Sequence, residues 1–235
     1  DKYDFTKKNF FALVKHNILI IINKFIYYYF YFDKFEENKS NLLFCFHRNP
    51  DSAIDIIGYR NTNQHEVLLN IIQETPSNIY INLRFHPHAT NYENFFKIKN
   101  KYKCFPNVKI LNPSIEIGSL IHGSRYVFSI AGTVSLEAAL LKKQSYIMED
   151  LFFSHLINKY SSNTPINYEL DNTVEEKENF DNKIYEFIET LYKSSYPGLL
   201  FNPDISKNYS DDKNLVAICS AFEDYLLNQS SFNFK

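Results

Sequence analysis

Short apolar runs alternate with helix-like segments over residues 41–148, and this alternation limits the folds open to the chain. The runs predicted as strands are 42–46, 79–85, 108–111, 125–130 and 145–148, and the segments predicted as helices are 64–74, 91–102, 115–122 and 133–141. Within 64–74, apolar residues recur at helical spacing. Strands and helices in regular alternation are typical of a parallel sheet. We therefore predict an α/β fold with five parallel strands and helices on both faces of the sheet.

Three of the predicted strands are followed by residues that suit a binding site. His47, His86 and Gly132 each come shortly after such a strand end. In open parallel sheets, ligands bind at the carboxyl ends of the strands. We therefore expect these three residues to lie on one edge of the sheet and to line a site there.

Residues 129–140 predict a strand, a tight turn at Gly132 and a helix in immediate succession. Free backbone N–H groups at the start of a helix, together with the helix dipole, suit a phosphate. We expect the hydroxyl groups of Thr133 and Ser135 to add donors, and the carboxylate of Glu137 to reach sugar hydroxyls. The alternative is a capped helix in which Glu137 only complements the dipole.

His86 stands between a predicted strand and Pro87, a residue that lacks an N–H donor and ends the strand. A histidine in this place can donate a hydrogen bond to a phosphate oxygen. When protonated, it can also offset negative charge that develops on a leaving group. We predict His86 as the catalytic residue, with a purely structural histidine as the alternative. A metal site formed with His88 is disfavoured, because no acidic cluster accompanies the two histidines.

The loop after the first strand is polar and charged, and loops in this position often supply site residues in α/β proteins. We expect His47, Arg48 and Asp51 to contact the ligand, although a solvated loop would have the same composition. The chain has four arginines, and Arg48 and Arg84 lie within two residues of a histidine. The planar guanidinium group binds phosphate with two parallel hydrogen bonds, which a lysine cannot do.

The composition argues against several other functions. The formal net charge is −2 and no dense run of Lys and Arg is present, so the charge pattern of a nucleic-acid binder is missing. The three cysteines are far apart, which fits a reducing cytoplasm and argues against disulfides or a thiolate zinc site. The glycine motifs of NAD enzymes, ATPases and serine hydrolases do not occur.

An apolar, aromatic segment over 10–32 precedes the alternating region. Polar residues interrupt it too often for a membrane-spanning helix, so we predict one or two helices that cover a hydrophobic surface. Contact with a membrane surface is the alternative. Residues 1–40 then form a helical segment and linker, and 41–235 form the main domain, in which 161–179 is a loop and 180–191 and 214–227 are helices. Because the first residue is Asp1, we expect a piece of a longer protein.

Four stretches, in order along the chain, resemble the motifs of bacterial capsule polysaccharide biosynthesis proteins. They are 46–53 with 58–59 and 63–64, then 81–87, 111–113 and 129–137. The corresponding family motifs are LHxQPE…G…xQ, lyVKeHP, a short strand that ends in proline, and vtGTxxxEA. The chain departs from them at Asn49 and Asp51, which replace Gln and Glu, and at Arg84, which replaces an acidic or polar residue.

This resemblance implies the C-terminal, Rossmann-like half of a GT-B glycosyltransferase, the half that binds the nucleotide-sugar donor. It implies that His86 and the turn at Thr133 hold the donor phosphate and that Glu137 holds the ribose. The donor-site residues expected on these grounds are His47, Arg48, Asp51, Arg84, His86, Pro87, Gly132, Thr133, Ser135 and Glu137. The resemblance further implies a CMP-activated sugar of the Kdo or sialic acid type, and neither metal nor cofactor, because protein groups serve the leaving phosphate.

The same resemblance implies a glycan or glycolipid acceptor, a base from the N-terminal half, and a location in the cytoplasm or at the inner face of its membrane. Two alternatives stay open. A CDP-glycerol-type polymer phosphotransferase shares the fold and the His-Pro strand end, but it favours Asp-Tyr-Ser at 131–133. A catalytically idle module of the same fold would bind nothing.

Overall fold

The computed structural model describes residues 14, 18, 21–22, 32–37, 40–48, 53–86, 99–161, 164–168, 174–199 and 211–229. The chain divides into two compact units, which we call the sheet domain (residues 1–173) and the helical unit (residues 174–235). The candidate site lies in the sheet domain.

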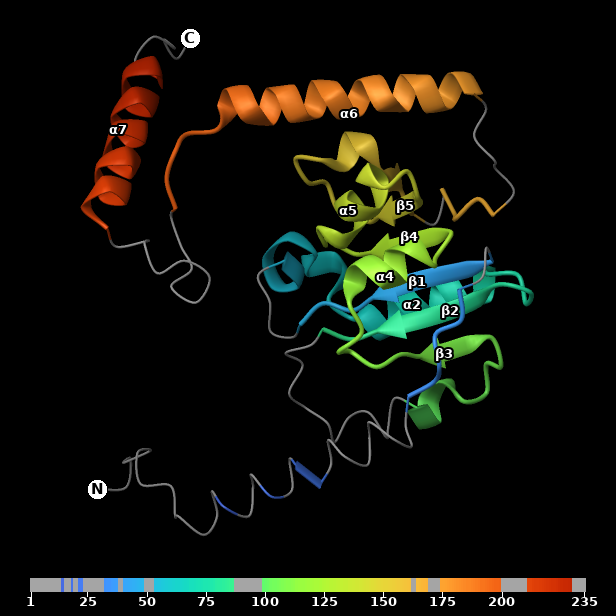
Figure 1. The fold of residues 1–235 in the computed structure, drawn as a ribbon. Coiled ribbons are helices and arrows are strands. Elements are labelled where there is room, and N and C mark those ends of the chain that lie inside the picture. Colours follow the sequence, from blue (N-terminus) through green and yellow to red (C-terminus); the bar gives the residue numbers. More distant parts are fainter. Residues whose placement is uncertain are drawn as a thin grey trace. The chain divides into compact units, whose positions relative to one another are not determined.

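Six parallel strands form one open sheet in the order β3-β2-β1-β4-β5-β6 (Figure 1). They are β1 (Asn41–Cys45), β2 (Tyr80–Arg84), β3 (Val108–Ile110), β4 (Tyr126–Ser129), β5 (Gln144–Ile147) and β6 (Asn158–Lys159). The predicted α/β fold is confirmed, with all five predicted strands. The sixth, β6, has only two residues, both exposed, so no apolar run indicated it. The strand order reverses between β1 and β4, which is where sheets of this kind bind ligands.

Helices cover both faces of the sheet, and β1 is buried along its whole length. On one face, α2 (Gln64–Glu74) packs on Phe44 and Phe128, whose rings stack with centroids 5.3 Å apart. On the other face, α4 (Ile117–His122) and α5 (Val134–Leu140) pack on Leu43 and Val127. The helix α2 has the predicted bounds. Most of the predicted helix 91–102 lies outside the described residues, and 99–102 are helical.

The loop predicted after β1 contains two helical turns, so that prediction is wrong over 53–61. A π-helical turn, η1 (Ala53–Ile57), precedes a 3-10 turn, η2 (Tyr59–Asn61). Ile54 is fully buried, and a Cβ at Gly58 would lie 3.3 Å from the carbonyl oxygen of Ala53 and 3.4 Å from a side-chain carbon of Ile130. Ile54 is the one buried residue of η1, and a single buried position gives too short a pattern to predict these turns.

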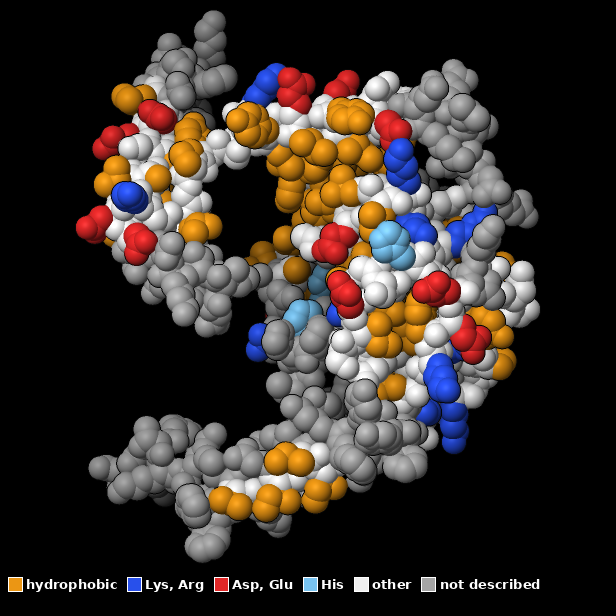
Figure 2. Space-filling model, in the orientation of Figure 1, with side chains coloured by type: hydrophobic (Ala, Val, Ile, Leu, Met, Phe, Trp, Pro, Cys, Tyr) orange, Lys and Arg blue, Asp and Glu red, His pale blue; other side chains and the backbone are white. Residues whose placement is uncertain are grey.

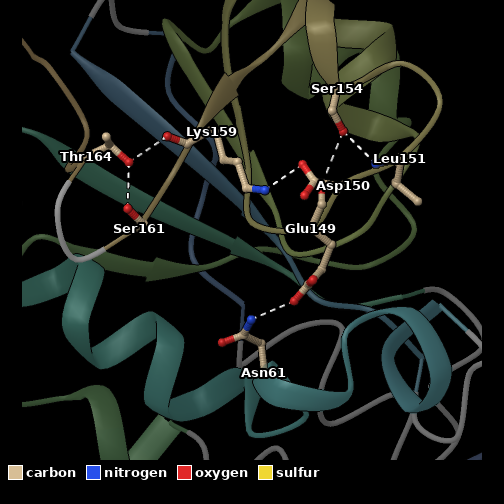
Figure 3. Close-up of polar contacts among 8 residues, drawn as sticks. All are labelled: Asn61, Glu149, Asp150, Leu151, Ser154, Lys159, Ser161 and Thr164. Atoms are coloured by element: carbon tan, nitrogen blue, oxygen red, sulfur yellow. Dashed lines mark hydrogen bonds and ion pairs between the residues drawn. The ribbon is translucent and has the colours of Figure 1, made fainter.

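The loop after β5 fastens η2 to the sheet (Figure 3). The side-chain amide of Asn61 donates to a carboxylate oxygen of Glu149 at 2.6 Å. The Ser154 hydroxyl, in η3 (Ser154–Leu156), accepts from the N–H of Leu151 and donates to the carbonyl of Glu149. The Asn61–Glu149 bond thus holds η2 beside the loop that follows β5.

Residues 32–37 run along the outer edge of β3. The N–H of Asp33 donates to the carbonyl of Ile110, and the N–H of Ile110 donates to the Asp33 carboxylate, both at 2.8 Å. Glu36 pairs with Lys109 at 3.4 Å. Phe35 packs on the α4 side of the sheet, so closely to Gly123 that a Cβ there would lie 2.6 Å from its ring.

Five residues of the predicted helical segment 10–32 are described. Val14, Ile18, Ile21 and Ile22 are helical with exposed side chains, whereas Phe32 is not helical and packs against the core. The predicted burial on a hydrophobic surface is therefore seen at Phe32 and not at the other four positions. Among the residues that the structure describes, no helix combines the length and apolar character needed to cross a bilayer.

The helical unit contains α6 (Val174–Ser194) and α7 (Asp212–Gln229). Both predicted helices are present. The loop predicted over 161–179 is wrong from Val174 onward, because α6 already begins there. Its first turns are rich in Glu, a good helix former, but poor in apolar residues, so apolar spacing did not reveal them.

A group of buried tyrosine hydroxyls fixes the segment after β6. Thr75 donates to the carbonyl of Ile71 and therefore accepts from the hydroxyl of Tyr168, 2.6 Å away. The hydroxyl of Tyr126 donates to the carbonyl of Tyr168 at 2.8 Å. In these bonds the hydroxyls of Tyr126 and Tyr168 both act as donors.

We expect the free energy of unfolding to fall at alkaline pH. Burial raises the pKa of Tyr102, Tyr160 and Tyr168 above that of a free tyrosine, and it raises the pKa of the Cys45 thiol to about 12. A group whose pKa is higher in the folded protein than in the unfolded chain stabilises the fold fully at pH values below its unfolded-state pKa, which is about 8.5 for cysteine and 10 for tyrosine. Its contribution to the free energy of unfolding is lost as the pH rises above that value. Urea unfolding at stepped pH measures this effect, and Tyr168→Phe should make the decline shallower. A constant free energy up to about pH 11 contradicts the expectation.

Candidate functional site

A cavity of about 370 Å³ opens at the carboxyl edge of the sheet, beside the reversal between β1 and β4. The ends of β1, β2 and β4, the turn η1, and the first turns of α4 and α5 surround it. Its lining residues are Cys45, Phe46, His47, Ala53, Arg84, His86, Ile117, Ser129, Ala131, Gly132, Thr133, Val134 and Glu137.

Six of the ten predicted donor-site residues line this cavity: His47, Arg84, His86, Gly132, Thr133 and Glu137. The expected meeting of His47, His86 and Gly132 at one edge is thus found, while their binding roles stay a prediction. Arg48 is exposed and does not line the cavity, and Ser135 is buried behind it. Asp51 and Pro87 lie outside the described residues.

A chain of buried hydrogen bonds supports the turn at Gly132. The Ser135 hydroxyl donates to the carbonyl of Tyr146 at 2.9 Å and lies 2.7 Å from the Ser129 hydroxyl, whose own proton can go to Ser135 or to the carbonyl of Gly132 at 3.1 Å. The Ser129 oxygen accepts from the N–H of Gly132 at 3.1 Å. Both serines are fully buried. Contrary to expectation, Ser135 therefore does not offer its hydroxyl to the cavity, because the core uses it to hold the turn.

His47 holds the turn from β1. Its Nε2 accepts from the N–H of Ala131 at 3.2 Å, so the neutral ring carries its proton on Nδ1. Gln64 of α2 fixes the His47 backbone: Oε1 accepts from the N–H at 2.8 Å, and Nε2 donates to the carbonyl at 3.3 Å. His47 is thus positioned from two elements, and one of its ring nitrogens already has a protein partner.

The turn offers fewer free donors than the sequence predicts. The N–H groups of Ala131 and Gly132 are bound within the protein, whereas those of Thr133 and Val134 have no hydrogen-bond partner among the described residues. A Cβ at Gly132 would lie 3.1 Å from the Ser129 oxygen, so a larger residue would press on the atom that accepts the Gly132 N–H. Thr133 and Val134 are therefore the donors that remain for a ligand.

Two opposite charges act on the floor of the cavity. Burial raises the pKa of the Cys45 thiol to about 12, against a smaller opposing effect of the Arg84 guanidinium and a smaller added effect of the Glu137 carboxylate. The thiol therefore stays protonated at neutral pH and is no nucleophile. Among the described residues, the ion pairs include neither Arg84 nor Glu137. Both charges are available to a ligand.

The charge distribution is otherwise mixed. On the face shown in Figure 2, acidic and basic side chains are interspersed over the sheet domain, without the one-signed patch that a nucleic-acid partner needs. Within the described ranges, no three His, Cys, Asp or Glu side chains are grouped so that they could hold a metal ion.

Sequence reasoning missed Ser129, Gln64 and Ile117. Ser129 was visible only as the last residue of a strand, and Gln64 only as part of a motif. Their roles depend on neighbours that are distant in sequence. Ile117 lines the cavity because α4 begins at the cavity wall. An isoleucine at the start of a helix gives no sign in the sequence that it belongs to a binding site.

A second cavity, of about 360 Å³, lies in the helical unit and has a mainly apolar, aromatic lining. Its residues are Tyr196, Pro197, Gly198, Ile218, Ala221, Phe222 and Tyr225. It contains no carboxylate, histidine or cation. The cavity in the sheet domain is therefore the candidate for chemistry.

Comparisons with known proteins found no matching family model and no matching curated sequence. Membership of the capsule polysaccharide family therefore stays a prediction from the motifs. Among solved structures, similarity was found to Thermosulfurimonas dismutans KpsC, as the β-Kdo 2,4-transferase (13% identity, TM-score 0.43) and the β-Kdo 2,7-transferase (18%, 0.39). Methanocaldococcus jannaschii UDP-GlcNAc 2-epimerase is also similar (16%, 0.38).

The matches cover 54%, 70% and 78% of this chain, and 40%, 51% and 46% of the respective solved chains. The chain thus spans about half or less of each of these proteins. A likeness at this distance assigns neither activity nor substrate.

Proposed function

We propose that the sheet domain binds the nucleotide-sugar donor of a metal-independent glycosyltransferase in capsule or related surface polysaccharide synthesis. The donor is a CMP-activated sugar of the Kdo or sialic acid type. The observation that carries the proposal is the gathering of His86, Thr133 and Glu137 around one cavity at the reversal of strand order. The capsule-family motifs fall on these same residues, which supports it further.

Each of these residues has a part in the proposal. The His86 ring donates to an oxygen of the donor phosphate. The hydroxyl of Thr133, with the N–H groups of Thr133 and Val134, provides further donors to that phosphate. The Glu137 carboxylate, one turn into α5, accepts from the ribose hydroxyls. His47, Gly132 and Ser135 hold the turn in the shape that this binding requires.

In the transfer, the acceptor hydroxyl attacks the anomeric carbon while the bond from that carbon to the phosphate oxygen breaks. The electron pair of the broken bond goes to the phosphate, where negative charge increases. Donors already aimed at that oxygen stabilise this charge most in the transition state. In this proposal the acceptor is a glycan or glycolipid, and the base that takes its proton comes from outside the described residues.

Calorimetric titration with CMP, CDP and UDP tests the proposal. We expect CMP to bind in buffer with EDTA and without Mg²⁺, and cytidine to bind more weakly because it lacks the phosphate. Equal affinity for all the nucleotides, or binding only with Mg²⁺, contradicts the choice of donor or the metal independence. If nothing binds to the folded protein, the proposal fails and the chain is an idle module.

Glu137→Gln should weaken binding of a ribonucleotide more than binding of its 2′-deoxy analogue. The amide accepts less strongly than the carboxylate, and the lost part of one hydrogen bond amounts to about 0.5–1.5 kcal/mol. Calorimetry on CMP and 2′-deoxy-CMP measures the difference, with Glu116→Gln as a control at an exposed carboxylate that does not line the cavity. Equal losses for the two nucleotides would remove Glu137 from the ribose.

A further inference from the structure

Arg84 is a half-buried cation without a counter-ion in the described structure. Its Nε is buried and has no hydrogen-bond partner. The one hydrogen bond of its side chain within the described residues runs from a terminal nitrogen to the carbonyl of Ile115 at 3.4 Å, which is longer than usual for such a bond. No described carboxylate forms an ion pair with it. The buried Nε therefore lacks the partner that a buried donor needs.

Arg84 differs in one respect from the other unpartnered polar side chain of β2. Asn82 is 1% exposed, and neither end of its amide has a partner, but it does not line the cavity. Arg84 does line the cavity. Its unpaired charge can therefore be neutralised by a bound anion, whereas the Asn82 amide is confined to the core.

The spacing of Arg84 and His86 indicates that they meet different groups of the ligand. Both line the cavity, whereas Phe85 between them is buried in the cluster on the opposite face. Arg84 is the last residue of β2 and His86 lies two residues beyond it, and two residues of extended chain span about 6.6 Å. An anion held by His86 and the Thr133 turn therefore leaves Arg84 free to bind a second one.

We propose that Arg84 is the specificity-determining residue for a second anionic oxygen group on the donor, in addition to the phosphate at His86. This group is either the second phosphate of a nucleoside diphosphate or a carboxylate on the transferred sugar. The inference rests on the proposed function for the first phosphate. It adds that Arg84 is the residue that binds the second anionic group, and that β2 thereby distinguishes donors with two such groups from those with one.

The test compares Arg84→Met with Arg125→Met, which removes the same charge from a half-buried arginine at the amino end of β4. Each protein is titrated with CMP, CDP, CMP-N-acetylneuraminic acid and inorganic pyrophosphate, and its melting temperature is measured.

We expect Arg84→Met to lose about 10- to 150-fold in affinity for a ligand with two anionic groups, which is the usual contribution of a hydrogen bond to a charged group. Its affinity for CMP should change by less than about threefold, and its melting temperature should not fall, because an unpaired charge is removed. Arg84→Lys, which keeps the charge without the planar fork, should lose less and serves if Arg84→Met does not fold.

The ligands separate the two sources of the second group. A selective loss for CDP assigns the second phosphate, and a selective loss for the CMP-sugar assigns the carboxylate. Equal losses for CMP and the other ligands, or no loss for any of them, overturn the inference while the proposed function stands. If the wild type binds no nucleotide, the proposed function fails. In that case, Arg84-dependent binding of pyrophosphate still supports an anion site, and its absence overturns that as well.

Discussion

Replacing His86 with alanine is expected to lower the affinity for CMP by about 1.5–3 kcal/mol, the usual contribution of a hydrogen bond to a charged group. The reason is that His86 is the ring in the cavity assigned to the donor phosphate, and alanine leaves no donor in its place. Thr133→Ala should have a smaller effect, because the N–H groups of Thr133 and Val134 remain. Calorimetry on the wild type and both variants measures the losses.

His122→Ala is the matched control for this experiment. His122 is an exposed histidine at the end of α4 that does not line the cavity, so its removal should leave CMP affinity unchanged. Melting curves of all variants separate lost binding from lost folding. Unchanged affinity in a folded His86→Ala variant would rule out the phosphate role and, with it, a direct part in catalysis.

Replacing Ser135 with alanine is expected to destabilise the sheet domain by about 1–3 kcal/mol, because it removes a buried hydrogen bond to the carbonyl of Tyr146. The Ser129 hydroxyl also loses its contact with Ser135 but keeps the carbonyl of Gly132 as an acceptor. For a chain of this size, each kcal/mol corresponds to about 2–4 °C in melting temperature. CMP affinity should fall as well, since the Gly132 turn loses part of its support.

Ser119→Ala removes the same hydroxyl from an exposed position on α4 and should change neither property. A Ser135→Ala variant as stable as Ser119→Ala would show that the hydrogen bonds behind the turn contribute little. A destabilised variant with undiminished CMP affinity would instead show that the turn keeps its shape without them.

The order of strands and helices could be predicted because buried parallel strands are short apolar runs, and α2 is amphipathic enough to be delimited from its spacing alone. The segments that could not be predicted lack such a pattern. The strand β6 has two exposed residues, and η1 is anchored by the single side chain of Ile54. The start of α6 is polar, so only helix propensity indicated it.

The location of the candidate site followed from topology, since strand ends of a parallel sheet must share an edge. The topology did not predict which way each side chain points. Ser135 was expected to meet the ligand, yet the carbonyl of Tyr146, from a strand that follows in the sequence, directs its hydroxyl into the core. Likewise, His47 and Ala131 are 84 residues apart, and the bond between them could not be predicted without the fold.

The bonds of residues 32–37 to β3 have a consequence for self-association. An open sheet has two free edges, and an exposed edge strand is a template on which another chain can add a strand and aggregate. Here Asp33 occupies both backbone groups of Ile110 on one edge, and the other edge ends in β6, a strand of two residues with Lys159 exposed. A second chain would therefore have to peel residues 32–37 away before it could extend the sheet beyond β3.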